Sequence, residues 1–170
     1  MEISILFLPL IASIISGFFG KIIGDRNSEI VTSLLVSISA LLSIFVLYQV
    51  IVNEYEENII IATWINSGSL DVNWSMLIDP LSAIMLVVVT SVSSLVHIYS
   101  IGYMSHDPHK PRFMAYLSLF TFAMLMLVTS DNFIQLFFGW EGVGLCSYLL
   151  IGFWYKKPAA NAAAIKAFIV

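Results

Sequence analysis

Residues 133–155 read FIQLFFGWEGVGLCSYLLIGFWY, and this stretch decides the class of fold. A membrane-spanning helix needs about 20 predominantly apolar residues to cross a hydrocarbon layer about 30 Å thick. The stretch has that length and character, and Glu141 is its one charged residue. Counted from Phe133 at about 1.5 Å per residue, Glu141 lies about 12 Å along the helix. We therefore expect a transmembrane helix with a carboxylate near the middle of the bilayer.

The composition of the whole chain agrees with a membrane protein. Of its 170 residues, 59% are hydrophobic and 11% are charged, and the mean hydropathy is +0.95. Soluble domains are about 45–50% apolar and about 25% charged, so a soluble enzyme, a nucleic-acid-binding protein and a disordered chain are excluded. The one cysteine, Cys146, excludes an internal disulfide and a cysteine-rich metal site. We predict an all-α, polytopic bundle of transmembrane helices with no metal site and no bound cofactor.

Four further apolar runs precede this stretch, each bounded by polar clusters. A sixth run begins after Pro158, but the part of it before Val170 is well short of the roughly 20 residues that a span needs. We therefore expect five full spans plus the start of a sixth, and we expect the chain to be the N-terminal part of a longer protein. The expected spans are residues 3–20, 30–52, 80–101, 113–129 and 133–155.

In the connections between the expected spans, basic residues occur only in alternate connections. The connection of residues 53–79 and the turn at Asp131-Asn132 contain no Lys or Arg. Loops on the cytoplasmic or matrix side carry the excess of Lys and Arg, so we predict that the N-terminus lies on the outer side. The basic residues of the inner connections are Lys21, Arg26, Lys110, Arg112, Lys156 and Lys157.

The outer connection, residues 53–79, has a pattern of its own. Residues 70–76 (LDVNWSM) alternate apolar and polar side chains, a period of two that is typical of a β-strand. Residues 59–64 can pair with them across Asn66-Ser67-Gly68, which predicts a small β-hairpin. The alternative is an irregular amphipathic loop anchored in the headgroup region by Trp64 and Trp74. The sequence leaves both open.

Glu141 is the first candidate functional residue. A carboxylate at this depth is costly in lipid, so it should face protein, and intramembrane acids are usually functional. Gly139, Gly142 and Gly144 flank it and leave space either for water or for close contact with a neighbouring helix. Because its protonation depends on burial and on nearby charge, we predict that Glu141 handles protons or ions. The alternative is a purely structural buried pair.

Lys166 is the second candidate, in the run NAAAIKA of residues 161–167. Its long stem can bring the ammonium group back to the inner interface. Alternatively, the ammonium group is an internal cation that interacts with acids on other helices, and the neighbouring alanines favour a helix packed against protein. The sequence does not decide between these two roles.

The histidines read as structural residues. His97 lies near the inner end of the third span. Its imidazole could relay protons, but we favour a structural role, as a hydrogen-bonded histidine at the membrane interface. The run His106-Asp107-Pro108-His109 has no helical i, i+4 ligand pair, so we interpret it as a solvated loop rather than a metal site. We find no arrangement of side chains that supports hydrolysis.

Residues 139–154 (GWEGVGLCSYLLIGFW) resemble the antiporter-like subunits of respiratory NADH:quinone oxidoreductase, complex I. Their family is called subunit L in bacteria and chain 5 in mitochondria. The resemblance covers most of the chain from Trp64 onward, whereas the first two spans match only in character. On this basis we divide the chain into an N-terminal two-helix segment with its outer loop (1–63) and the start of the antiporter-like proton-translocating domain (64–170). The other matching runs are residues 79–82 (DPLS), 97–100 (HIYS), 112–117 (RFMAYL) and 162–168 (AAAIKAF).

The resemblance implies a role in proton translocation. The chain would be part of a translocase, the subunit that couples NADH oxidation and quinone reduction to proton pumping. Glu141 falls on the glutamate of the family's fifth helix, which pairs with a lysine on a later helix. The sites for NADH, FMN, iron–sulfur clusters and quinone would lie on other subunits, and the partners would be other membrane subunits of complex I. The membrane would be the bacterial inner membrane or, alternatively, the mitochondrial inner membrane.

Two other functions remain open. A large subunit of a multisubunit Na⁺/H⁺ antiporter would use the same kind of buried acid. A purely structural arm that holds other subunits would need neither Glu141 nor Lys166 to titrate.

Overall fold

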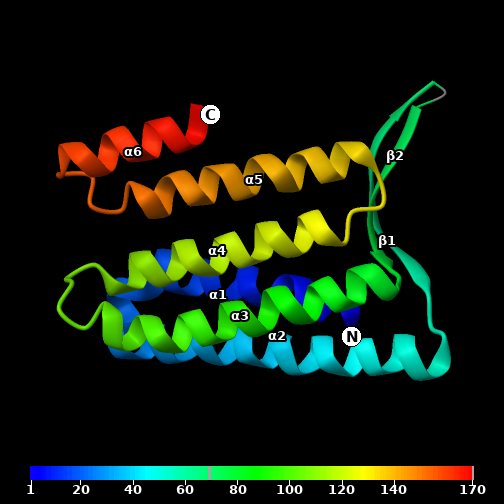
Figure 1. The fold of residues 1–170 in the computed structure, drawn as a ribbon, viewed down its shortest axis with the longest axis horizontal. Helices are drawn as coiled ribbons and strands as arrows, with labels where there is room; N and C mark the ends of the chain where they lie inside the picture. Colours follow the sequence, from blue (N-terminus) through cyan, green and yellow to red (C-terminus); the bar gives the residue numbers. More distant parts are fainter. Residues whose placement is uncertain (69, 170) are drawn as a thin grey trace.

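The computed structural model describes residues 1–68 and 70–169. In this part the chain forms six helices and one two-stranded antiparallel sheet (Figure 1). The helices are α1 (Glu2–Ile23), α2 (Asp25–Asn53), α3 (Pro80–Tyr103), α4 (Lys110–Val128), α5 (Phe133–Ile151) and α6 (Pro158–Ile169). The strands are β1 (Glu57–Ser67) and β2 (Leu70–Ile78).

Five of these helices, α1 to α5, are long and apolar enough to cross a membrane. This confirms the predicted polytopic helix bundle. α2 begins at Asp25, before the apolar run does, because Gly24 has a φ of +88° and turns the chain directly from α1 into α2. The polar first turns of α2 are therefore helical, although hydropathy alone assigns them to the connection.

The expected end of the fifth span is wrong. α5 ends at Ile151 rather than at Tyr155, and the chain then turns. The guanidinium of Arg112 lies 4.6 Å from the centre of the Phe153 ring, and its Nη2 donates a hydrogen bond of 3.1 Å to the carbonyl oxygen of Phe153. A residue in the first turn of α4 thus holds the turn, and the apolar run of residues 133–155 gives no sign of this contact.

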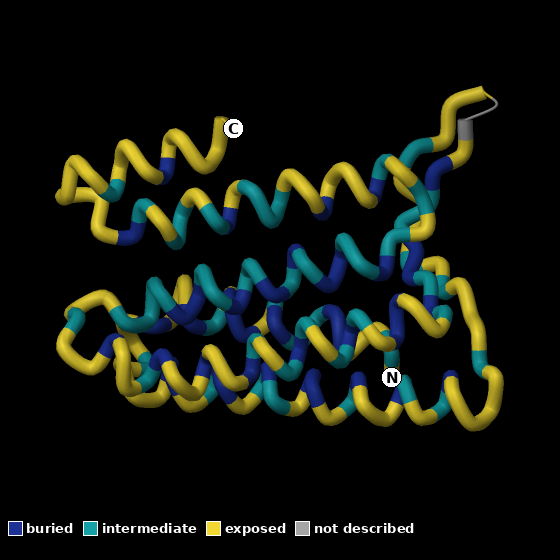
Figure 2. The backbone as a smooth tube through the Cα atoms, viewed as in Figure 1, coloured by how far each residue is buried: buried dark blue, intermediate teal, exposed yellow. Residues whose placement is uncertain are grey.

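The helices pack around α4, which contacts α1, α2, α3 and α5. α5 lies on α4, and α6 lies on α5, so that these two helices form the outer layers of one side (Figure 1). Figure 2 shows buried residues along the facing sides of α1 to α4, whereas α5 and α6 are mostly exposed or half-buried. In the most apolar part of α5 only 17% of residues are buried, against 33–39% for α1 to α4. One side of the molecule therefore has a large uncovered helical surface.

The predicted β-hairpin is confirmed. β1 and β2 pair antiparallel, with Glu57 opposite Ile78 and with two register shifts between Ile60 and Ile65. Figure 1 shows the hairpin crossing one end of the bundle. Met76 and Ile78 are fully buried in the core that α1 to α4 share, because the apolar side chains of β2 close the end of this core. The alternative, an irregular loop, is thereby excluded.

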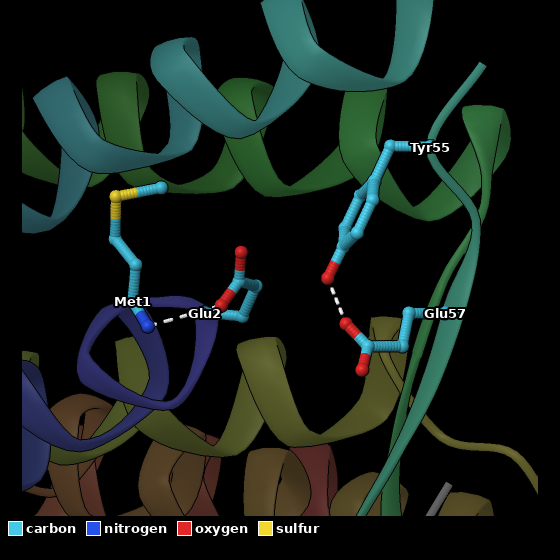
Figure 3. A network of polar contacts seen from close by, with 4 residues as sticks. All are labelled: Met1, Glu2, Tyr55 and Glu57. Carbon is cyan, nitrogen blue, oxygen red and sulfur yellow. Dashed lines mark hydrogen bonds and ion pairs between the residues drawn. The ribbon is translucent and has the colours of Figure 1, made fainter. Parts of the chain in front are cut away.

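The two ends of the bundle differ in charge. The connections 24, 104–109 and 152–157 lie together at one end, here called the basic end, and the six basic residues of the connections and helix ends lie there. The opposite end, here called the hairpin end, holds the N-terminus, the hairpin and residues 129–132. At the hairpin end the Met1 amino group pairs with Glu2 at 3.0 Å, and the Tyr55 hydroxyl donates to Glu57 (Figure 3). The geometry thus separates the connections as the charge pattern predicts.

Candidate functional site

The helix that carries Glu141 is fixed to α4 by a stripe of small and buried residues. Gln135, Gly139 and Cys146 are the buried residues of α5, and their spacing of four and seven places them on one face. A Cβ atom on Gly139 would lie 2.8 Å from the backbone nitrogen and Cα of Leu127 on α4. Glycine at this position therefore allows the two backbones to touch, which is the packing role that the sequence offered for the glycines.

Glu141 lies on a different side of α5. It is exposed, and at about 100° per residue it is turned roughly 140° away from the stripe that faces α4. Tyr148, seven residues on and therefore on the same side, packs its ring 5.6 Å from that of Phe168 on α6. Glu141 thus shares the side of α5 that α6 covers, but it lies about 10 Å farther toward the hairpin end than Tyr148. No ion pair or hydrogen bond joins its side chain to another described residue.

Lys166 does not approach Glu141. Gly152 of α5 lies against Ala164, and Tyr148 lies against Phe168, so the side of α6 that bears Ala164 and Phe168 faces α5. Lys166 is two residues from each of them and therefore projects from the opposite side of α6. Both candidate residues are exposed, at positions that the described residues leave uncovered.

A buried polar network lies between α3 and α4. His97 is fully buried, its Nε2 is 3.0 Å from the Ser118 hydroxyl, and its Nδ1 is 2.8 Å from the Ser93 carbonyl oxygen. The Ser93 hydroxyl also hydrogen-bonds to Thr121 at 2.5 Å. His97 is hydrogen-bonded, as expected, and it lies inside the bundle because Ser93 and Ser118 supply the partners of its imidazole.

The loop at residues 104–109 is held by Asp107. The carboxylate accepts hydrogen bonds from the Trp154 indole at 2.9 Å and from the His109 backbone N–H at 2.8 Å. Partial burial raises the pKa of Asp107, but these bonds and the charges of His109 and Arg112 lower it more, so the pKa lies below its usual value. Among the described residues no group of three His, Cys, Asp or Glu could hold a metal ion.

Two buried polar residues, Gln135 and Glu29, were not predicted from the sequence. Gln135 is 0% exposed and hydrogen-bonds to the backbone of β2, whereas an amide near the end of an apolar run reads as an interfacial residue. Glu29 is 6% exposed, although its position beside Asp25 and Arg26 assigns it to a solvated connection. The one sequence feature that points to burial of Glu29 is that it directly precedes Ile30, where the apolar run starts.

Two family models match the chain. Residues 64–114 match NADH-Ubiquinone oxidoreductase (complex I), chain 5 N-terminus. Residues 130–170 match the transmembrane model NADH:quinone oxidoreductase/Mrp antiporter. Glu141 and Lys166 both lie within the second match. The matched segments therefore include the hairpin strand β2, the helix α3 and the two helices that carry the candidate residues.

Similar proteins cover the whole chain. NADH-ubiquinone oxidoreductase chain 5 of Phytophthora infestans is 55% identical over 168 residues, which are 99% of this chain and 25% of that protein. NADH-quinone oxidoreductase subunit L of Rhodobacter capsulatus is 54% identical over 177 residues, covering 100% of this chain and 25% of that protein. This chain thus spans a quarter of the length of these relatives.

A solved structure shows the same fold. A chain of the membrane-bound sulfane sulfur reductase, an archaeal respiratory membrane complex, superimposes with a TM-score of 0.79 over 99% of this chain and 34% of that chain. Its sequence identity is 18%, so the likeness concerns the fold alone. With five helices that can span a membrane and relatives of this kind, the chain is an integral, multi-pass membrane protein. It belongs to the family of complex I chain 5 and subunit L.

Proposed function

We propose that the chain is the N-terminal part of a proton-translocating subunit of an NADH:quinone oxidoreductase, a translocase that couples NADH oxidation and quinone reduction to proton pumping. The observation that carries this proposal is the position of Glu141. Its carboxylate lies midway along a membrane-spanning helix, at a position that the described helices leave uncovered. A carboxylate facing lipid at this depth is costly, so a further transmembrane segment covers it in the whole protein.

In this proposal Glu141 is a switchable proton carrier. A carboxylic acid in a low-dielectric site loses its proton more readily when a cation approaches, and it regains the proton when the cation withdraws. Another helix supplies that cation, because Lys166 projects from the far side of α6. The match of the antiporter-like family model across residues 130–170 supports this role. Lys166 is the second proton-handling residue, paired with an acid on another helix.

The redox reactions belong to other subunits in this proposal. NADH, FMN, iron–sulfur clusters and quinone are bound there, and this chain contacts the other membrane subunits of the complex within the bilayer. The relatives' names, chain 5 and subunit L of an oxidoreductase, support such a division. The membrane is the bacterial inner membrane or, as the alternative, the mitochondrial inner membrane.

We propose further that residues 1–63 and 64–170 differ in role rather than in packing. The boundary falls within β1, and α1 packs on α4 as well as on α2. The N-terminal segment thus completes the core on which α4 and α5 are held, and residues 64–170 begin the translocating domain.

The large subunit of a multisubunit Na⁺/H⁺ antiporter is the second candidate function, because the matching family model covers both groups. Proteoliposomes that contain the complete complex distinguish the two. Uptake of protons driven by NADH oxidation, without sodium exchange in the absence of NADH, supports the oxidoreductase. Sodium exchange driven by a pH gradient without NADH supports the antiporter. Unchanged proton transport after neutralisation of both Glu141 and Lys166 would instead favour a structural arm.

A further inference from the structure

A second carboxylate is buried at the basic end, in the first turns of α2. Glu29 lies in the part of α2 that packs against α1 and α4, and its side chain is 7% exposed. Ser16 of α1 donates a hydrogen bond of 2.8 Å to the carbonyl oxygen of Pro111 on α4. A Cβ atom on Gly20 would lie 2.5 Å from Pro111 and 3.4 Å from the Ser28 hydroxyl. The helices α1, α2 and α4 therefore enclose this region by themselves, and its burial does not depend on the uncovered side of α5.

Three buried polar atoms lack a hydrogen-bond partner among the described residues here. They are Ser28 Oγ, Glu29 Oε1 and Ser33 Oγ. Ser33 follows Glu29 by one helical turn, so the two side chains share one face of α2. Thr32, by contrast, satisfies its hydroxyl by donating to the Ser28 carbonyl oxygen at 2.8 Å. Since buried polar atoms in native proteins are nearly always paired with protein or with ordered water, this cluster points to a ligand with both donors and acceptors.

The ammonium group of Lys110, beside Glu29, favours water over a metal cation as this ligand. Lys110 Nζ lies 4.0 Å from Glu29 Oε1, which is longer than the roughly 2.7–3.2 Å of a direct hydrogen bond. The ammonium group repels a metal cation, whereas a water molecule accepts from the ammonium and donates to the carboxylate. Lys110 is the first residue of α4 and its side chain is 21% exposed. It therefore connects the buried carboxylate to the aqueous phase at the basic end.

We propose that Glu29, Ser28, Ser33 and Lys110 bind ordered water and form a proton-binding site at the basic end, separate from Glu141. A hydronium ion transfers its proton through this water to the Glu29 carboxylate, leaving water and a neutral carboxylic acid, and the reverse step releases the proton. Lys110 is the one charged group that the described residues place within ion-pair distance of Glu29. Other titratable groups in the parts of the helices nearest the basic end are Lys21 on α1, Asp25 and Arg26 on α2, His97, Tyr99 and Tyr103 on α3, and Arg112 and Tyr116 on α4.

Infrared difference spectroscopy of the full-length subunit in its assembled complex tests this site. Spectra recorded at two pH values, in H₂O and in D₂O, should contain a carboxylic acid band that shifts in D₂O. Glu29→Gln should remove this band completely, and Ser33→Ala should shift it by changing the hydrogen bonds of the water. Ser39→Ala, whose hydroxyl donates to the Ile5 carbonyl oxygen elsewhere on α2, should leave the band unchanged. Glu141→Gln should also leave it unchanged, so the result is independent of the role proposed for Glu141.

A map of the unaltered complex that resolves ordered water provides a test without any substitution. The proposal requires at least one water within hydrogen-bond distance of the Glu29 carboxylate and of Lys110 or Ser33. A direct hydrogen bond between Lys110 and Glu29 with no water beside them would overturn it. The proposal would also be overturned if Glu29→Gln removed no carboxylic acid band from the difference spectrum.

Discussion

The side-chain amide of Gln135 on α5 forms two hydrogen bonds with the backbone of Ser75 on β2. Nε2 donates to the Ser75 carbonyl oxygen at 2.6 Å, and the Ser75 N–H donates to Oε1 at 3.0 Å. The backbone N–H of Gln135 donates in turn to Asn132 Oδ1, the cap of α5. Trp64, Trp74 and Phe138 pack together beside this contact. The hairpin therefore fixes the first turns of the helix that carries Glu141.

Replacing this amide should destabilise the protein. Gln135→Leu removes both hydrogen bonds and leaves the Ser75 N–H and carbonyl oxygen buried without partners, so we expect the free energy of unfolding to fall by about 2–4 kcal/mol. Gln49→Leu on α2 is the matched control, since among the described residues the Gln49 side chain hydrogen-bonds only to the exposed Asn53 side chain. It should change stability by less than about 0.5 kcal/mol. Denaturant unfolding of the full-length subunit in detergent measures both. Equal losses would show that the Ser75 contact contributes little.

The glycines of α5 should differ in their tolerance of a methyl group. Gly139→Ala places a Cβ 2.8 Å from the Leu127 backbone, which cannot move as a side chain can, so α5 must shift away from α4 at a cost of about 1–3 kcal/mol. Gly144→Ala meets nothing within 4 Å among the described residues. It should leave the amount of folded protein and its melting temperature unchanged or slightly raised. Equal melting temperatures of the two variants would contradict the α4–α5 packing described above.

Most of the fold follows from hydropathy and charge. The five spans and the sixth helix start near the predicted residues, because the polar clusters that bound the apolar runs also contain the caps and turns. Asp79, for example, accepts from the Ser82 N–H at 2.6 Å and starts α3. The hairpin was predictable as one of two alternatives, since the period of two in residues 70–76 matches a strand that buries one face against the core.

The rest depended on contacts between residues distant in sequence. Nothing in residues 133–155 reveals that Arg112 ends α5 by binding Phe153. Likewise, Glu29 and Gln135 lie near polar clusters at the ends of apolar runs in the sequence, but both are buried in the structure. Glu141 was identifiable as an intramembrane acid, but its side of α5 could be assigned only once Gly139 and Tyr148 were seen to face α4 and α6. The sequence pattern thus predicts how far along a helix a charged residue lies, whereas the side of the helix that faces its neighbours is known only from the packing.

The loop at the basic end should respond to acid through Asp107. Because the pKa of Asp107 is lowered in the folded protein, its ionised form stabilises the loop at pH values above the ordinary pKa of an aspartate. This contribution is lost as the pH falls through the lowered pKa. Trp154→Phe removes the indole donor, so the pKa of Asp107 should rise toward its ordinary value. A titration of the ¹³C-labelled Asp107 carboxyl by NMR measures it, and an unchanged midpoint in the variant would contradict the assignment.

The two ends of the bundle should face opposite sides of the membrane. Glu56 is exposed at the hairpin end and Lys156 at the basic end, while the native Cys146 is buried. We expect a membrane-impermeant maleimide to label Glu56→Cys from the outer side and Lys156→Cys only from the cytoplasmic or matrix side. Labelling of both variants from one side would be incompatible with an odd number of spans between these positions.

The number of protons translocated per NADH oxidised after Glu141→Gln tests the proton-carrying role of Glu141. The substitution keeps the size of the side chain but removes its titration, and it is made in the full-length subunit within the assembled complex. Glu56→Gln, at an exposed carboxylate outside the helices, is the matched control and should keep the normal ratio. We expect Glu141→Gln to lower the ratio while NADH oxidation continues. A normal ratio in a normally assembled Glu141→Gln complex would contradict it.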